Sequence, residues 1–221
     1  MSAALRLLQL ASPALPIGGY SYSSGLESAI ESGRVTDAET AFEWIDDAMS
    51  LVLGRFDAPL LAAALHACQD DDHSRLSELN RLALAARETA EFRRESEQMG
   101  YSLMQWAIHV PGLGSRSPAP AMPMSAVVAW ALAAWRLHLQ PTDAVTGFLW
   151  SFAENQVMVL IKTMPIGQIQ AQQVLFRLGE RIGTVVDTAL RLPPPEWSNA
   201  APALAIASMH HETQYSRLFR S

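Results

Sequence analysis

Charged side chains are scarce in this sequence. Of its 221 residues only 17% are charged, whereas 49% are hydrophobic. Such a composition supplies ample material for a core but thin cover for a surface, which predicts that a partner covers part of the surface. The formal net charge is −6, and the chain has no long basic block. We therefore do not expect nucleic acid among its ligands.

Cysteine and long apolar runs are scarce as well. Cys68 is the sole cysteine, which rules out an internal disulfide and fits a reducing compartment. The longest uninterrupted apolar run, residues 126–135, is about half of the roughly 20 residues needed to span a bilayer. The first 16 residues resemble a signal peptide only weakly. We expect a soluble protein of the cytoplasm that does not enter the membrane.

Alternating strand patterns are nearly absent, and helical periodicity dominates. The pattern predicts helices over residues 5–10 and 25–31, from Thr36, from Asp57 to the acidic run at 70–72, from Ser74, up to Pro111, after Ser125, from Pro141, after Pro165, and from about Pro202. We predict one all-α domain over residues 1–221, a bundle of about eight to ten helices without repeats or a sheet. Residues 111–123, rich in proline and glycine, are expected to form an exposed connection within it.

Several residues are predicted to begin helices. Serines of the segment 21–24 are expected to cap the helix over residues 25–31, and Gly33 to end it. Thr36 and Asp57 are the expected N-caps of the next two helices, the second with Pro59 in its first turn. The helix after Ser125 is apolar almost all round, which predicts a place at the centre of the bundle.

The stretch from Ala153 to Val174 is unusual. Between Lys162 and Arg177 it has no charged side chain, and its polar positions are glutamines: Gln168, Gln170, Gln172 and Gln173. Neutral amides can be buried against hydrogen-bonding partners at lower cost than charges. Pro165 lacks a backbone donor, so we expect a bend or a fresh helix start there. The residues alone favour two packed helices joined by a proline corner.

Signatures of catalysis are missing from the sequence. It has no GxxxxGK[ST] loop, no HExxH and no nucleophile elbow. His210 and His211 form a candidate metal cluster with Glu212, but adjacent histidines on a helix point about 100° apart. We expect His211 on a contact face, His210 partly exposed, and packing roles for His66 and Cys68. The residues thus point to a helical binding protein without enzymatic activity.

Three segments together resemble a known family. LLQLASPALPIGGYSYSSGLE (residues 7–27), ENQVMVLIKTMPIGQ (residues 154–168) and HETQYSRLFRS (residues 211–221) are similar to the urease accessory protein UreF family, in the family order and spacing. The resemblance implies an all-α fold, a homodimer and a cytoplasmic complex with UreD (also called UreH) and the GTPase UreG. That complex helps to install the nickel centre of the urease apoprotein. It also implies a non-enzymatic adaptor with no cofactor of its own, since partner proteins handle nickel and GTP.

The resemblance also implies two partner surfaces. Glu27 and Lys162 match family residues tied to the UreG-facing surface, to which we assign Tyr20, Ser24, Pro165 and Gln168 as well. The expected UreD-facing tail comprises His211, Tyr215, Arg217, Leu218 and Phe219. Glu27 follows a Gly-Gly turn and Lys162 precedes a proline, so both are expected on protruding edges. The tail is too apolar for a solvated terminus, so we expect it to dock on a partner.

Two functions of different classes follow. The first is an adaptor in urease maturation, with a variant in which Lys162 or Arg177 acts on the GTPase transition state in trans. The alternative is a nickel carrier that uses His210, His211 or Cys68. The neutral glutamines around Gln168 are expected to belong to a hydrogen-bonding surface within the dimer or complex.

Overall fold

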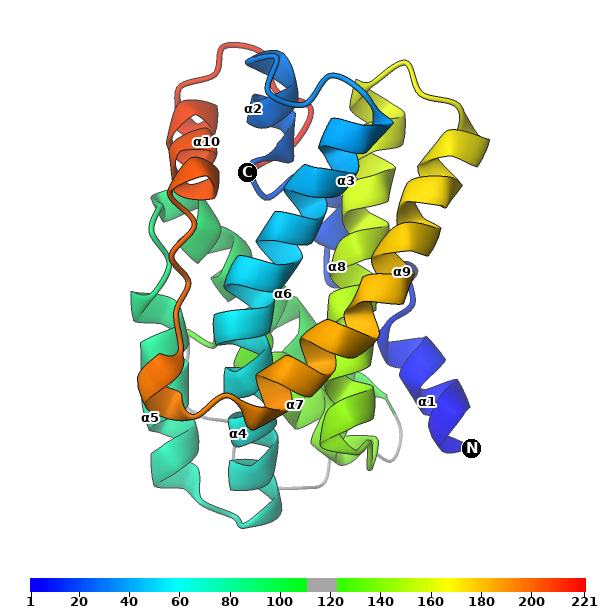
Figure 1. Ribbon diagram of the computed structural model, residues 1–221. Coiled ribbons are helices and arrows are strands. Elements are labelled where there is room, and N and C mark those ends of the chain that lie inside the picture. The colour runs from blue at the N-terminus through cyan, green and yellow to red at the C-terminus, as the bar shows by residue number, and fades with distance from the viewer. Residues whose placement is uncertain (111–122) are drawn as a thin grey trace.

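The protein is all-α in the computed structural model, which describes residues 1–110 and 123–221 (Figure 1). This part holds α1 (Ala3–Leu10), α2 (Leu26–Glu31), α3 (Ala38–Asp47), α4 (Ala58–Gln69), α5 (His73–Ala85), α6 (Ala90–His109), α7 (Ala126–Arg136), α8 (Pro141–Thr163), α9 (Gln168–Arg191) and α10 (Pro202–Glu212), and no strand. The predicted fold class is confirmed. The predicted loop at 111–123 lies outside the described residues except for Pro123, which is exposed.

The helices α3 and α4 form one uninterrupted helical run. A π-helical segment, Ala48–Asp57, joins them, so the prediction of a separate helix capped by Asp57 is wrong. Asp57 has helical φ and ψ, and its buried carboxylate forms an ion pair with Arg87 instead. Pro59 deprives the carbonyl of Arg55 of its α-helical donor, and the backbone N–H of Ser198 donates to that oxygen at 3.1 Å. The distant segment at Ser198 therefore satisfies the backbone oxygen that Pro59 leaves without a donor inside the helical run.

Two other predicted caps are corrected. Asp37, not Thr36, caps α3: its Oδ1 accepts from the backbone N–H of Thr40 at 2.9 Å in a capping box. Gly25, at φ 84°, precedes α2 without a side-chain cap, because the serines before it bond elsewhere. Ser125 does cap α7, as predicted, with its Oγ accepting from Val128.

Helix α7 occupies the centre of the bundle, as its apolar sequence predicts. Its residues are buried except for the half-buried Ala126 and Trp135. Trp130 donates its indole N–H to the carbonyl of Ala144 at 3.0 Å and meets Phe148 edge-on at 5.6 Å. A buried indole that is both packed and hydrogen-bonded fixes α7 against α8.

The proline corner separates two long antiparallel helices, α8 and α9 (Figure 1). Pro165 is exposed between them, and α9 begins afresh at Gln168, as expected. The glutamines at 168, 170, 172 and 173 are exposed in the single chain, and their expected place in a surface of the dimer or complex stays a prediction. Beside them Ile169 and Phe176 are 80% and 69% exposed. This uncharged, partly apolar face of α9 is left without a cover.

Two helical runs, Ala38–Gln69 and Pro141–Thr163, are long and apolar enough to cross a membrane by length and composition alone. Within the protein, 78% and 50% of their most apolar windows are buried. Burial of this extent is typical of core helices, and one hydrophobic cluster extends from Leu10 to Phe219. The single-domain organisation stays a prediction.

Candidate partner-docking site

The three segments of the family-like motifs meet at one end of the bundle. There the chain before and through α2, the last turn of α8 and the C-terminal tail lie together (Figure 1). The tail, residues 213–221, leaves α10 and crosses back over α2 (Figure 1). Segments from the beginning, the middle and the end of the sequence thus build one surface.

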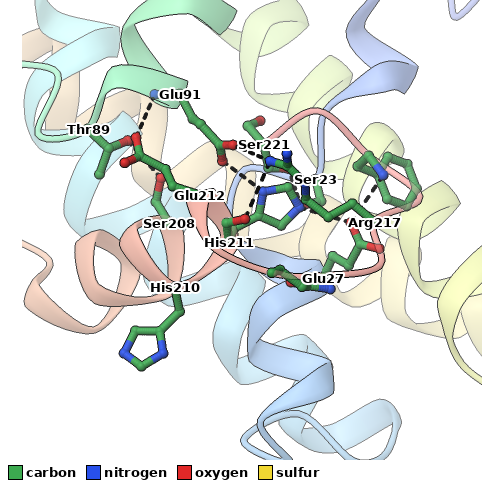
Figure 2. Close-up of polar contacts among 12 residues, drawn as sticks. Ser23, Glu27, Thr89, Glu91, Ser208, His210, His211, Glu212, Arg217 and Ser221 are labelled. Atoms are coloured by element: carbon green, nitrogen blue, oxygen red, sulfur yellow. Dashed lines mark hydrogen bonds and ion pairs between the residues drawn. The ribbon is translucent and has the colours of Figure 1, made fainter.

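Glu27 of α2 holds the tail through hydrogen bonds to its backbone. It lies in the first turn of α2 and is only 6% exposed. Its Oε1 accepts the backbone N–H of Leu218 at 2.7 Å, and its Oε2 accepts that of Phe219 at 3.1 Å and lies 3.0 Å from Nε2 of His211 (Figure 2). Since hydrogen bonds to a carboxylate are strong, this one side chain fixes two successive tail residues.

His211 connects Glu27 to a second buried carboxylate. Its ring is fully buried, with Nδ1 2.7 Å from Oε2 of Glu91 (Figure 2). Both ring nitrogens face carboxylate oxygens, so both contacts are hydrogen bonds when both nitrogens carry protons. Arg217 donates to the other oxygen of Glu91 at 2.7 Å. Both acids therefore lie against basic side chains in this carboxylate cluster (Glu27, Glu91, His211 and Arg217).

The tail also pairs with the N-terminal motif through its backbone. The N–H of Arg220 donates to the carbonyl of Ser21 at 2.8 Å, and the N–H of Ser23 donates to the carbonyl of Ser221 at 2.8 Å. The hydroxyl of Ser23 donates to the same carbonyl. Ser221 is fully buried as a result.

Glu95 of α6 lies behind this pairing. Its carboxylate accepts from Ser24 at 3.0 Å and from Ser221 at 2.6 Å. Burial raises the pKa of Glu95, and the two hydroxyls oppose that rise. Ser24 has φ 52°, and Gly25 follows at φ 84°. This left-handed turn aims the Ser24 hydroxyl inward, toward Glu95.

Lys162 lies at the outer edge of the same surface. It is the only lysine of the sequence and is exposed, with Nζ 5.4 Å from the centre of the Phe219 ring, a cation–π contact. A shallow hollow, the Lys162 hollow, is lined by Tyr20, Ser21, Lys162, Leu218, Phe219 and Arg220. Burial, with a smaller effect of Glu154, raises the pKa of Tyr20. Tyr20 and Lys162 are therefore brought together with the tail.

Other residues of the predicted UreG-facing set lie differently. Pro165 and Gln168 are exposed in the proline corner and outside the lining of the Lys162 hollow. The expectation that Glu27 protrudes is wrong, because its carboxylate is buried by the tail. Ser24 also turns inward, toward Glu95. Whether any of these residues meets UreG stays a prediction.

Some side chains of the predicted UreD-facing tail are buried against the protein, and others are exposed to solvent. His211 and Phe219 are buried against the chain itself, so the expectation that His211 lies on an open contact face is wrong. The apolar Phe219 is covered by its own chain rather than by a partner. Tyr215 is fully exposed and Leu218 is 71% exposed, whereas Arg217 is tied to Glu91. Assignment of these residues to a UreD contact stays a prediction.

The candidate metal ligands are scattered. His210 is exposed and points away from the carboxylate cluster, in which His211 is engaged (Figure 2). His66 is exposed beside Gln69, so its expected packing role is wrong. Cys68 is buried, as predicted, and burial raises the pKa of its thiol to about 12. Within residues 1–110 and 123–221, no group of three or more histidine, cysteine, aspartate or glutamate side chains is arranged to hold a metal ion.

Sequence reasoning missed the residues of α6 that receive the tail. Glu91 and Glu95 lie among the alternating arginines and glutamates of residues 91–97, which resemble a solvated helix face. Their i, i+4 spacing places both on one side of α6, and nothing local distinguishes that side from the exposed one. The signal lies only in the tail residues that approach them.

The chain is similar to known proteins over its full length. The family model described as UreF matches residues 35–179. The chain is 48% identical to a urease accessory protein UreF of Azoarcus sp. (strain BH72), over 98% of this chain and 95% of the relative. It is 46% identical to that of Ectopseudomonas mendocina (strain ymp) over the full length of both chains. The relative in Azotobacter vinelandii (strain DJ / ATCC BAA-1303) is 47% identical over 97% of each.

Proposed function

Because the chain belongs to the UreF family of urease accessory proteins, we propose that it acts as an adaptor in the assembly of the urease nickel centre. Proteins of this family are not enzymes. In this proposal the protein works in the cytoplasm with UreD (UreH), the GTPase UreG and the urease apoprotein. It couples GTP hydrolysis by UreG to metal insertion, and the partner proteins bind the GTP and the nickel.

The observation that carries the proposal is the meeting of all three motif segments at one end of the bundle. Lys162 and Tyr20 line its open edge, and we assign them to the UreG contact together with the neighbouring Pro165 and Gln168. Glu27 and Ser24 contribute indirectly. Glu27 holds the tail in place, and Ser24 holds the turn before α2 in place. A fixed charge at the rim of an interface adds specificity and speeds association more than it adds affinity.

We assign the UreD contact to the exposed part of the tail. Tyr215 and Leu218 project from it, and Ile206 and Met209 of α10 are each 51% exposed. Apolar side chains exposed on one helix and its following segment are suited to a protein interface. The buried His211 and Phe219, with Arg217 bonded to Glu91, give this contact a fixed base.

We also propose that the protein is a homodimer and that the uncharged face of α9 forms the contact. Identical faces meet across a twofold axis, so a charge near that axis would oppose its own copy. Beside Ile169 and Phe176 lie Gln170, Gln172 and Gln173, whose amides both donate and accept hydrogen bonds. The charged side chains that line the same hollow are Asp37, Glu39 and Arg177. Arg177 fixes the face by bonding Glu39 at 2.6 and 2.8 Å and by stacking 3.8 Å from the ring of Phe42.

Lys162→Ala tests the adaptor function. We expect the variant to fold and to co-purify with UreD, but to recruit UreG weakly or to uncouple GTP hydrolysis from urease activation. Lys162→Arg, which keeps the charge and the stacking on Phe219, is the matched control and should behave as wild type. Co-purification, urease activation and single-turnover GTP hydrolysis by UreG are the measurements. Full activation by Lys162→Ala with unaltered UreG binding would refute the role of Lys162.

A further inference from the structure

A groove lies between the outer face of α6 and the C-terminal tail. From α6 it is lined by Arg94, Gln98 and Tyr101, and from the other side by Tyr22, Arg217 and Arg220. We call it the arginine groove. The three α6 residues stand at i, i+4 and i+7, so they form one stripe along the helix.

Two guanidinium groups in the groove lack an acidic partner. Glu91 and Glu97 also line it, but Glu91 is bonded to Arg217 and His211, and Glu97 is bonded to Arg93 at 2.9 Å. The salt bridges formed within residues 1–110 and 123–221 include neither Arg94 nor Arg220. The chain as a whole is acidic, with a net charge of −6. Arg94 and Arg220 therefore bring to the groove two guanidinium groups without an ion pair among the described residues.

The groove is fixed before any ligand arrives. The backbone N–H of Arg220 is bonded to Ser21, and its side chain bonds to the hydroxyl of Tyr22. Arg94 stands in the second turn of a 20-residue helix. Because the arginines are held by ordered elements, binding need not order the backbone that carries them.

We propose that the arginine groove binds an acidic, extended segment of a partner protein. Carboxylates of that segment pair with the guanidinium groups of Arg94 and Arg220. The planar guanidinium group can bind a carboxylate through two parallel hydrogen bonds. Tyr101, which is 48% exposed, and Gln98 share the lining and contact the backbone and apolar atoms of the segment. Tyrosine and arginine are the residue types that dominate binding energy at protein interfaces.

The lining favours discrete carboxylates over a nucleic acid. Glu91 and Glu97 keep two negative groups beside the groove, and these repel a densely charged phosphate backbone. Single acidic side chains spaced along an extended peptide can reach the arginines and avoid the glutamates. This contact rests on the proposed adaptor function. Its α6 residues lie outside the Lys162 hollow, whereas Phe219 and Arg220 line both surfaces.

A peptide titration tests the inference. The probe is a fluorescein-labelled peptide of alternating glutamate and leucine, with the same peptide carrying glutamine for glutamate as the neutral comparison, measured by fluorescence anisotropy on the full chain. We expect saturable binding of the acidic peptide, weakened about tenfold by Arg94→Ala or Arg220→Ala, as for the loss of a charged hydrogen bond. Arg81→Ala is the control, since Arg81 is exposed on α5 and lies outside the lining of the groove, and it should change the affinity less than about twofold.

Three outcomes would overturn the proposal. They are no binding of the acidic peptide, equal weakening by Arg81→Ala and Arg94→Ala, or tighter binding of polyphosphate than of the peptide with the same arginine dependence. Arg94→Ala is decisive because Arg220 also helps to hold the tail through Tyr22. Loss of peptide binding in Arg94→Ala leaves the proposed adaptor function standing, because Arg94 lies outside the Lys162 hollow that the Lys162→Ala test examines.

Discussion

Individual carboxylates determine where the C-terminal tail lies. Glu27 accepts two tail amides, Glu91 receives Arg217 and His211, and Glu95 receives Ser221. Each acid comes from a helix, α2 or α6, and each bond reaches the tail or the end of α10. Three acids on rigid helices therefore hold a segment that has no regular structure of its own.

Glu27→Gln should release the tail. The amide has one acceptor oxygen, so its NH₂ group would face a backbone N–H where the carboxylate accepted one. We expect a loss of about 1–3 kcal/mol in the free energy of unfolding and faster hydrogen exchange at residues 213–221. Glu31→Gln, at an exposed position on the same helix, is the control and should change neither. Unchanged exchange in the tail of Glu27→Gln would show that the carboxylate does not hold it.

Glu95 should impose a pH dependence on stability. Its pKa is raised by burial above the ordinary 4.5, so its contribution to stability is fully present below that pH and is lost as pH rises through the folded-state pKa. Glu95→Gln removes this titration but keeps an acceptor for Ser24 or Ser221. Guanidinium chloride unfolding at several pH values above 4.5 should show the stability of the variant, relative to wild type, rising with pH. Parallel curves would contradict the assignment.

At the scale of helices, substitution of two glycines by alanine should change the stability of the protein in opposite directions. A Cβ on Gly100 of α6 would lie 2.2 Å from the backbone carbonyl of Met124, just before α7, whereas one on Gly183 of α9 would meet nothing within 4 Å. Gly100→Ala should therefore destabilise the protein by about 1–3 kcal/mol through overpacking. Gly183→Ala should stabilise it by about 0.4–1 kcal/mol, because alanine favours the helix. Thermal unfolding of the two variants measures both, and equal effects would refute the close approach of α6 to Met124.

Helices were predictable where their signals are local. Ser125 before an apolar stretch identified α7 and its cap, and Pro165 identified the break between α8 and α9. Asp57 failed as a cap because Arg87 takes its carboxylate and Ser198 satisfies the carbonyl that Pro59 leaves free. Both partners are distant in sequence, so no local pattern indicates them.

The oligomeric state is a property of the whole molecule and can be tested through α9. Ile169→Arg with Phe176→Arg would place like charges across the proposed twofold contact. We expect this double variant to sediment as a monomer of 24.2 kDa, whereas the wild type sediments as a dimer. Leu82→Arg, which replaces a 42% exposed apolar residue on α5, is the control and should remain dimeric. A dimer that survives the double substitution places the contact elsewhere.

The sequence by itself determined the all-α fold, the central helix and the three motif segments, because periodicity, caps and proline breaks act within a few residues. Only the tertiary structure decided that Glu27 faces inward. The backbone donors that bury its carboxylate belong to Leu218 and Phe219, 191 and 192 positions further along the chain. Whether an acid is solvated or buried depends on the donors that surround it, and here the folded tail supplies them. The tertiary structure also decided what lies beside Lys162. The ring of Phe219 folds back against it, whereas Tyr215 of the same tail is exposed.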